Sequence, residues 1–257
     1  MTRRRALNIA LEVGTTAAVV AGVWIYLAGG HGYAWPSVPE MLSAFRRAWL
    51  SDKFGEHAVP SLIRLALGFV LAVVMGLAGG TAMGLSRTIR LLATPIVSFL
   101  RSIPAVALLP LSLVLFGFGT TQKVAVIAFV CCWPVVLNVA DGIAELNPTM
   151  LASARSYAID GTTRLRFIIV PAIMPRLFAA MRISLSLAIL LLVTSEMVAS
   201  KEGIGFFIWQ SQLTFRIDNM WAGIILLGLL GITLNALFQA IERHFTRWHH
   251  SLSGSAE

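Results

Sequence analysis

The most constraining feature of this chain is a succession of long apolar runs, separated by short segments that carry most of the charge. A helix of roughly 20 apolar residues is long enough to cross the hydrocarbon core of a bilayer. The sequence is 57% hydrophobic and only 12% charged, which leaves too little polar surface for a soluble domain. It therefore predicts an all-α polytopic membrane protein with about six transmembrane helices in a single domain, residues 1–257. The predicted spans are about 6–28, 61–85, 91–119, 124–139, 176–200 and 221–241.

Prolines interrupt the third of these runs. Pro95, Pro104 and Pro110 all lie within residues 91–119. Proline removes a backbone donor from a helix and clashes with the preceding turn, so each one is a potential break. Broken helices are tolerated in membranes where the freed backbone groups find other partners. We therefore expect this span to be kinked or to consist of two pieces.

The basic residues orient the predicted spans. Cytoplasmic loops of membrane proteins are enriched in lysine and arginine. Arg3, Arg4 and Arg5 precede the first run, and Arg243 and Arg247 follow the last. Placing both termini in the cytoplasm puts most of the 20 lysines and arginines on that side. The prediction is a multi-pass protein of the cell (inner) membrane, surrounded by lipid. Its net charge of +8 then needs no nucleic acid as a partner.

Small residues follow one face of the predicted span 61–85. Gly68, Ala72, Gly76, Gly80 and Gly84 are each four residues apart. Residues at this spacing share a helix face, and small side chains there form a groove into which another helix fits closely. The pattern predicts that this face is a helix-packing surface.

A shorter amphipathic segment lies between the first two runs. Met41, Phe45 and Trp49 recur every four residues, and Arg46 and Arg47 lie off that stripe. The pattern indicates an amphipathic helix. It is compatible with a helix lying on the membrane surface and equally with a helix packed on the other spans.

The polar, basic segment 141–175, between the fourth and fifth spans, is the most informative part of the sequence. A stretch of small residues from Leu151 predicts one helix, Asp160 and Gly161 predict a turn, and a second amphipathic piece ends at proline. Two short helices at an angle form a compact projection that fits a groove on a soluble partner. The alternative is a plain connection, although loops of this length are uncommon without a function.

This segment resembles the EAA loop of binding-protein-dependent ABC importer permeases. The family pattern is Glu-Ala-Ala, three residues, Gly, and then a run that ends in Leu-Pro. Aligned on Pro171, the Glu-Ala-Ala falls on residues 152–154 and the glycine on Ala158, so this chain lacks both the glutamate and the glycine. The resemblance implies that the loop couples the spans to a separate ATPase, with altered contacts and a stiffer turn. The coupling residues so implied are Ala152, Ser153, Ala154, Arg155, Ala158, Gly161, Arg164, Arg166 and Pro171.

Further motifs are similar to the nitrate, sulfonate and taurine branch of that family. They are Trp35-Pro36-Ser37, Leu100-Arg101-Ser102-Ile103-Pro104, Ser195-Glu196-Met197 and Gly203-Ile204-Gly205. The resemblance implies a type I ABC importer permease without a cofactor of its own. It also implies these partners: a second copy of the chain, two cytoplasmic ABC ATPase subunits and an extracytoplasmic solute-binding protein. The implied function is the import of a small polar, anionic solute by alternating access.

Arg101, Asn138 and Glu196 are polar residues within or near the apolar runs. Charged groups at such places are costly and usually face a cavity or a partner. One interpretation places them along the passage of a small polar solute, where Arg101 suits an anion. The other is that they satisfy backbone groups of broken helices or lie at the membrane interface.

Two other classes of membrane protein fit the sequence less well than an importer subunit does. A secondary transporter or channel needs intramembrane carboxylates or broken repeats for ion coupling, and only Glu12 and Glu196 qualify. A membrane enzyme needs clustered acids or histidines, which the sequence does not show. No catalytic residue and no metal site are predicted, and ATP hydrolysis is expected on a separate subunit.

Overall fold

The computed structural model describes residues 14–15, 22 and 36–245. In this part of the chain all regular structure is helical, and the prediction of an all-α polytopic membrane protein is confirmed. Four helical segments are long and apolar enough to cross a membrane, and a bent pair of helices brings the number to five. These four are Phe54–Leu85, Thr120–Ala144, Gly161–Ala199 and Ile217–Phe245. The predicted span 6–28 lies outside the described residues, apart from positions 14, 15 and 22.

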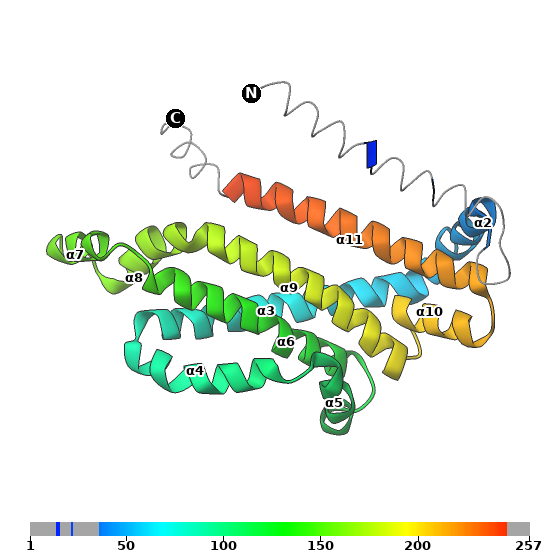
Figure 1. The fold of residues 1–257 in the computed structure, drawn as a ribbon, viewed down its shortest axis with the longest axis horizontal. Helices are drawn as coiled ribbons and strands as arrows, with labels where there is room; N and C mark the ends of the chain where they lie inside the picture. The colour runs from blue at the N-terminus through cyan, green and yellow to red at the C-terminus, as the bar shows by residue number, and fades with distance from the viewer. Residues whose placement is uncertain (1–13, 16–21, 23–35, 246–257) are drawn as a thin grey trace.

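The long helices lie alongside one another (Figure 1). In this view α7 and α8 project at one end of the molecule, and α2 and α10 lie toward the opposite end. The helices are α2 (Val38–Trp49), α3 (Val59–Leu85), α4 (Arg87–Ser102), α5 (Leu108–Phe116), α6 (Thr120–Ala144), α7 (Pro148–Ser156), α8 (Gly161–Arg164), α9 (Val170–Ala199), α10 (Ile204–Leu213) and α11 (Ile217–Phe245).

The small-residue face of α3 lies against α6. Each glycine on this face meets a β-branched side chain of α6, and a Cβ placed on Gly76 would lie only 2.5 Å from the Cβ of Val135. Ala72 is fully buried and shares a core cluster with Cys131 of α6. The pairs keep one constant offset in sequence, so the two helices run in the same direction. They are Gly68 with Ile127, Gly76 with Val135, Gly80 with Val139 and Gly84 with Ile143.

Two of the membrane-crossing segments contain the same local feature near their start, a five-residue π-helical turn followed by Val-Pro. The turn Phe54–Ala58 precedes Pro60, and Leu165–Ile169 precedes Pro171. The wider turn accommodates a proline that lacks an N–H and crowds the preceding turn of an α-helix. The expectation that the second amphipathic piece ends at proline is therefore wrong, since the helical segment Gly161–Ala199 runs through both Pro171 and Pro175.

The proline-containing stretch is divided into α4 and α5, whose axes differ by 80°. The break lies between Ser102 and Ala105 and includes Pro104. Pro95, in contrast, lies inside α4. Pro110 lies in the first turn of α5, where a missing N–H leaves no intrahelical hydrogen bond unmade. Only one of the three prolines therefore coincides with the break.

Helix α2 packs on the other helices, which decides between the two interpretations of this amphipathic segment. Ala44, Ala48 and Trp49 are buried in a cluster formed with α10 and α11. The indole Nε1 of Trp49 donates a hydrogen bond to the carbonyl oxygen of Ala222 at 2.9 Å. Phe45 packs against the same cluster and is partly exposed.

Candidate functional site

The segment between α6 and α9 rests on an apolar base. The side chains of Leu146, Leu151 and Leu165 pack against a buried cluster that includes Ile143 and Ile169. At the start of α7 the Asn147 carboxamide oxygen accepts the Thr149 backbone N–H at 2.8 Å, which satisfies a free donor of the first turn. The segment is thus a packed projection at the end of the bundle.

The turn between α7 and α8 has a left-handed residue at the position where the family pattern has glycine. Ala158 has φ +51°, and the Ile159 N–H returns to the Ala154 carbonyl oxygen at 3.1 Å. This is the helix-ending arrangement in which glycine is usual, because a Cβ disfavours the left-handed region.

Asp160 then begins α8. Its carboxylate accepts the backbone N–H groups of Thr162 and Thr163, both at 3.1 Å. Hydrogen bonds from these two residues lower the pKa of the Asp160 carboxyl. The carboxylate is thus held in its charged form, which suits the N-terminus of a helix.

We expect Ala158→Gly to stabilise this turn. Glycine removes the cost of a left-handed alanine, about 1–2 kcal/mol, and part of that gain is offset by the greater freedom of glycine in the open segment. Hydrogen exchange of the amides of residues 157–164 should slow about threefold. Ala152→Gly, within α7, is the matched control and should speed exchange, because glycine weakens a helix interior. Equal effects of the two changes would contradict this account.

The residues implied by the family resemblance differ in their accessibility. Ala152, Ser153, Ala158, Gly161 and Arg166 are exposed, Arg164 and Pro171 are half-buried, and Ala154 is buried. The side chain of Arg155 lies outside the described part of the structure.

Sequence reasoning missed two aromatic residues on this projection, Tyr157 and Phe167. Their side chains are 81% and 67% exposed. The guanidinium of Arg166 lies over the Phe167 ring, 5.5 Å from its centroid. Aromatic residues in a polar, basic segment are the signal that could have identified them, because exposed aromatic and arginine side chains are typical of binding surfaces.

Ion pairs brace the base of the projection. The Arg176 guanidinium on α9 binds the Glu145 carboxylate, and Arg90 on α4 binds Asp141 on α6 at 2.5 Å. The hydrogen bond from Arg176 lowers the pKa of Glu145, which therefore stays ionised at neutral pH. These contacts hold α4, α6 and α9 together at the place where the projection begins.

At the opposite end of α9, Glu196 is fully buried. Its carboxylate accepts hydrogen bonds from the Ser61 hydroxyl at 2.8 Å and the Gly205 backbone N–H at 3.0 Å. Arg64 pairs with it at 3.0 Å. Since Gly205 lies in the first turn of α10, one carboxylate joins α9 to α3 and to the positive end of α10. Inside this chain Glu196 therefore faces these partners and has no exposed surface.

The Gly203-Ile204-Gly205 motif makes room for this carboxylate. Gly203 has φ +119°, and a Cβ there would lie 2.3 Å from the Glu196 Cδ. A Cβ on Gly205 would lie 2.4 Å from the carbonyl oxygen of Val193. The two glycines and Glu196, which appear as separate motifs in the sequence, form one structural unit.

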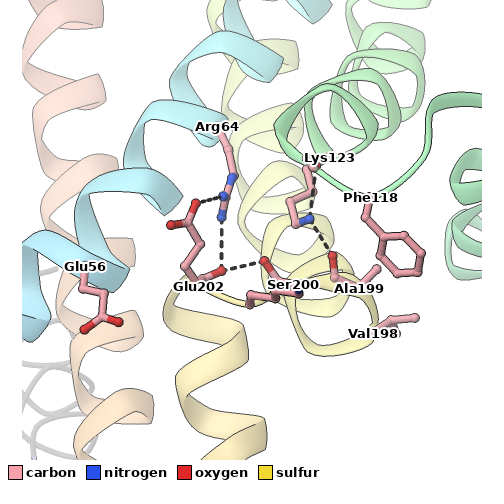
Figure 2. A pocket seen from close by; sticks show the side chains of 10 residues that line it. Glu56, Arg64, Phe118, Lys123, Val198, Ala199, Ser200 and Glu202 are labelled. Carbon is pink, nitrogen blue, oxygen red and sulfur yellow. Dashed lines mark hydrogen bonds and ion pairs between the residues drawn. The ribbon is translucent and has the colours of Figure 1, made fainter.

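A cavity of about 600 Å³ opens beside this cluster. Arg64 reaches toward it from α3 and pairs with Glu202 at 2.5 Å (Figure 2). Lys123, which is 1% exposed, donates from Nζ to the carbonyl oxygens of Ala199 at 2.8 Å and Gly119 at 3.2 Å. The two buried cations of the cavity wall, Arg64 and Lys123, are thus engaged in contacts that hold helix ends together.

The three polar residues proposed for a passage have separate surroundings. Arg101 is exposed at the end of α4, whereas Glu196 belongs to the buried cluster. The Asn138 side chain donates to the Pro134 carbonyl oxygen of its own helix at 2.9 Å, which matches the alternative that it satisfies helix backbone. Among the described residues no group of three or more His, Cys, Asp or Glu side chains is placed to hold a metal.

Comparison with known proteins places the chain in a family. Residues 68–249 match the model of the binding-protein-dependent transport system inner membrane component. The putative aliphatic sulfonates transport permease protein SsuC of Bacillus subtilis (strain 168) is 29% identical, with 92% of this chain and 87% of the relative covered. The taurine transport system permease protein TauC of Escherichia coli (strain K12) is 31% identical, with 76% and 70% covered.

A solved structure shows the same fold. A chain of the MetNI methionine ABC transporter, in an inward-facing conformation, is 21% identical with a TM-score of 0.61. The alignment covers 82% of this chain and 99% of that one. From the family model and these relatives, the chain belongs to the family of inner-membrane components of binding-protein-dependent transport systems.

Proposed function

We propose that this chain is the membrane-spanning permease subunit of an ATP-driven importer for a small polar anion. Its named relatives carry aliphatic sulfonates, taurine, bicarbonate and nitrate, which have anionic groups in common. Two copies of the chain would form the passage, and a solute-binding protein would deliver the anion from outside. Both termini and the α7–α8 end would lie in the cytoplasm.

The observation that carries this proposal is the projection formed by residues 147–169. It combines a packed apolar base with exposed Tyr157 and Phe167. These features favour docking into a groove of a separate ATPase subunit. Because α8 continues into α9 without a gap, movement of a docked ATPase would pass directly to a membrane-crossing helix.

Reversing the charge of Arg155 and Arg164 together, by Arg155→Glu and Arg164→Glu, is expected to abolish association with the ATPase. Like charges placed opposite each other in an interface cost several kcal/mol, so co-purification from solubilised membranes should fall at least tenfold. The control is Arg46→Glu with Arg216→Glu, which makes the same charge change at exposed sites away from the projection. Wild-type recovery of the ATPase by the first variant would defeat the docking proposal.

The importer function itself is tested by uptake into proteoliposomes. The chain is reconstituted with its ATPase and binding protein, and taurine, an alkanesulfonate, nitrate and bicarbonate are offered in turn. Uptake of at least one anion should require ATP hydrolysis. Uptake that proceeds equally well without the ATPase subunit would instead favour the secondary transporter or channel.

A further inference from the structure

Helix α4 presents three different sides. Ala93 and Val97 pack against the buried cluster shared with α6. A second side is apolar and exposed, with Leu92, Ile96 and Phe99 at 69%, 60% and 69% exposure. The third side is polar and also exposed; it is formed by Thr94, Ser98 and Arg101, which follow one another at spacings of four and three residues.

The apolar and polar exposed sides cannot have the same surroundings. The 16 residues of α4 span about 24 Å, most of the roughly 30 Å hydrocarbon core. Apolar side chains at this depth are well placed against lipid. A hydroxyl or a guanidinium facing lipid is costly, and such groups normally face a water-filled cavity or a partner.

Two of the three polar side chains on this side lack a partner within the described part of the chain, whereas the Thr94 hydroxyl donates a hydrogen bond to the Arg90 carbonyl oxygen of its own helix at 2.6 Å. Ser98 makes no side-chain hydrogen bond there, and Arg101 has no acidic side chain within ion-pair distance. Arg90 is different, because it is paired with Asp141. Arg101 also lies at the 80° break before α5.

We propose that the polar side of α4 lines the aqueous passage of the permease, with Thr94 and Ser98 along its wall and Arg101 as the group that attracts the anion. The inference rests on the proposed function, because it takes the chain to be a permease for an anion. It assigns the passage to α4 and not to Glu196 or Lys123, whose polar atoms are already committed to other helices.

Cysteine labelling tests whether this side contacts water. Thr94→Cys and Ser98→Cys are compared with Ile96→Cys and Phe99→Cys, which are exposed at neighbouring positions of the same helix. The protein is held in lipid nanodiscs, so that a charged methanethiosulfonate reagent reaches both membrane faces. The native Cys131 and Cys132 are buried and provide the background rate. We expect the polar positions to react at least tenfold faster, because the reagent needs water and a thiolate.

The charge assignment is tested with reagents of opposite sign. In the Ser98→Cys variant, adding Arg101→Gln should lower the ratio of anionic to cationic labelling rates at least threefold. Arg87→Gln removes the same charge at a position about 16 Å from Ser98 along the helix. This distance is beyond the Debye length of about 8 Å, so the ratio should stay nearly unchanged.

Two results would overturn the inference. Equal labelling of the polar and apolar positions would mean that lipid or a second copy covers this side of α4. Fast labelling with a charge ratio that Arg101→Gln does not change would refute the role given to Arg101. The labelling rates are measured without ATP or ATPase, so they are independent of whether residues 147–169 dock as proposed.

Discussion

Gly76→Ala is expected to lower the midpoint of thermal unfolding in detergent by about 5 °C, and Gly76→Leu to leave little folded protein. The added Cβ would lie 2.5 Å from the Val135 Cβ and 3.2 Å from the Cys132 carbonyl oxygen. Neither atom is at the end of a flexible side chain, so the helices must separate. Overpacking of this kind costs about 1–3 kcal/mol, and 1 kcal/mol corresponds to about 2–4 °C in a chain of this size.

The neighbouring Gly79 provides the matched control. A Cβ there meets only the Val136 Cγ2, at 3.4 Å. Gly79→Ala should therefore be neutral or slightly stabilising, since alanine is the better helix former. The midpoint can be read from size-exclusion profiles of heated samples. If Gly76→Ala and Gly79→Ala melt together, close packing of α3 on α6 does not limit stability.

Glu196→Ala is expected to be the most damaging single change, with a loss of about 3–5 kcal/mol and little folded protein. Removing one partner of a buried ion pair leaves the other charge uncompensated. Here the change also removes the acceptor for Ser61 and for the Gly205 N–H at the start of α10. Folded yield and the thermal midpoint in detergent measure the effect.

A double substitution separates a structural role of Glu196 from a role in transport. Arg64→Met with Glu196→Met replaces both charges by apolar groups of similar size, and such replacements are often close to neutral. We expect the double variant to recover much of the lost yield. A single Glu196→Ala variant that folds normally but transports no solute would argue for a passage role and against the buried cluster as a structural joint.

The fold class was accessible from the sequence because the hydrocarbon core imposes length and hydropathy on each span. Local packing was accessible as well, since a four-residue spacing of small side chains has a direct geometric meaning. The course of α9 through Pro171 was not accessible, because the π-helical turn that accommodates this proline has no simple sequence signature. The choice of Pro104 over Pro95 as the break likewise depends on what surrounds each residue.

The surroundings of Glu196 could not be derived from its own segment. Its main partners, Ser61 and Arg64, lie more than 130 residues earlier in the chain, and only the packing of α3 beside α9 brings them together. A polar residue in an apolar run predicts that some partner exists. It does not predict whether the partner is water in a passage or a side chain of another helix.

The helical segment Gly161–Ala199 has 39 residues, so it forms a rod about 58 Å long. One end carries the projection and the other carries Glu196. A tilt of this helical segment by about 5° about the end that carries the projection shifts the other end, where Glu196 lies, by about 5 Å. Hydrogen bonds of the Glu196 carboxylate cannot stretch that far. Any such movement of the projection must therefore either carry α3 and α10 along with α9 or break the hydrogen bonds of Glu196.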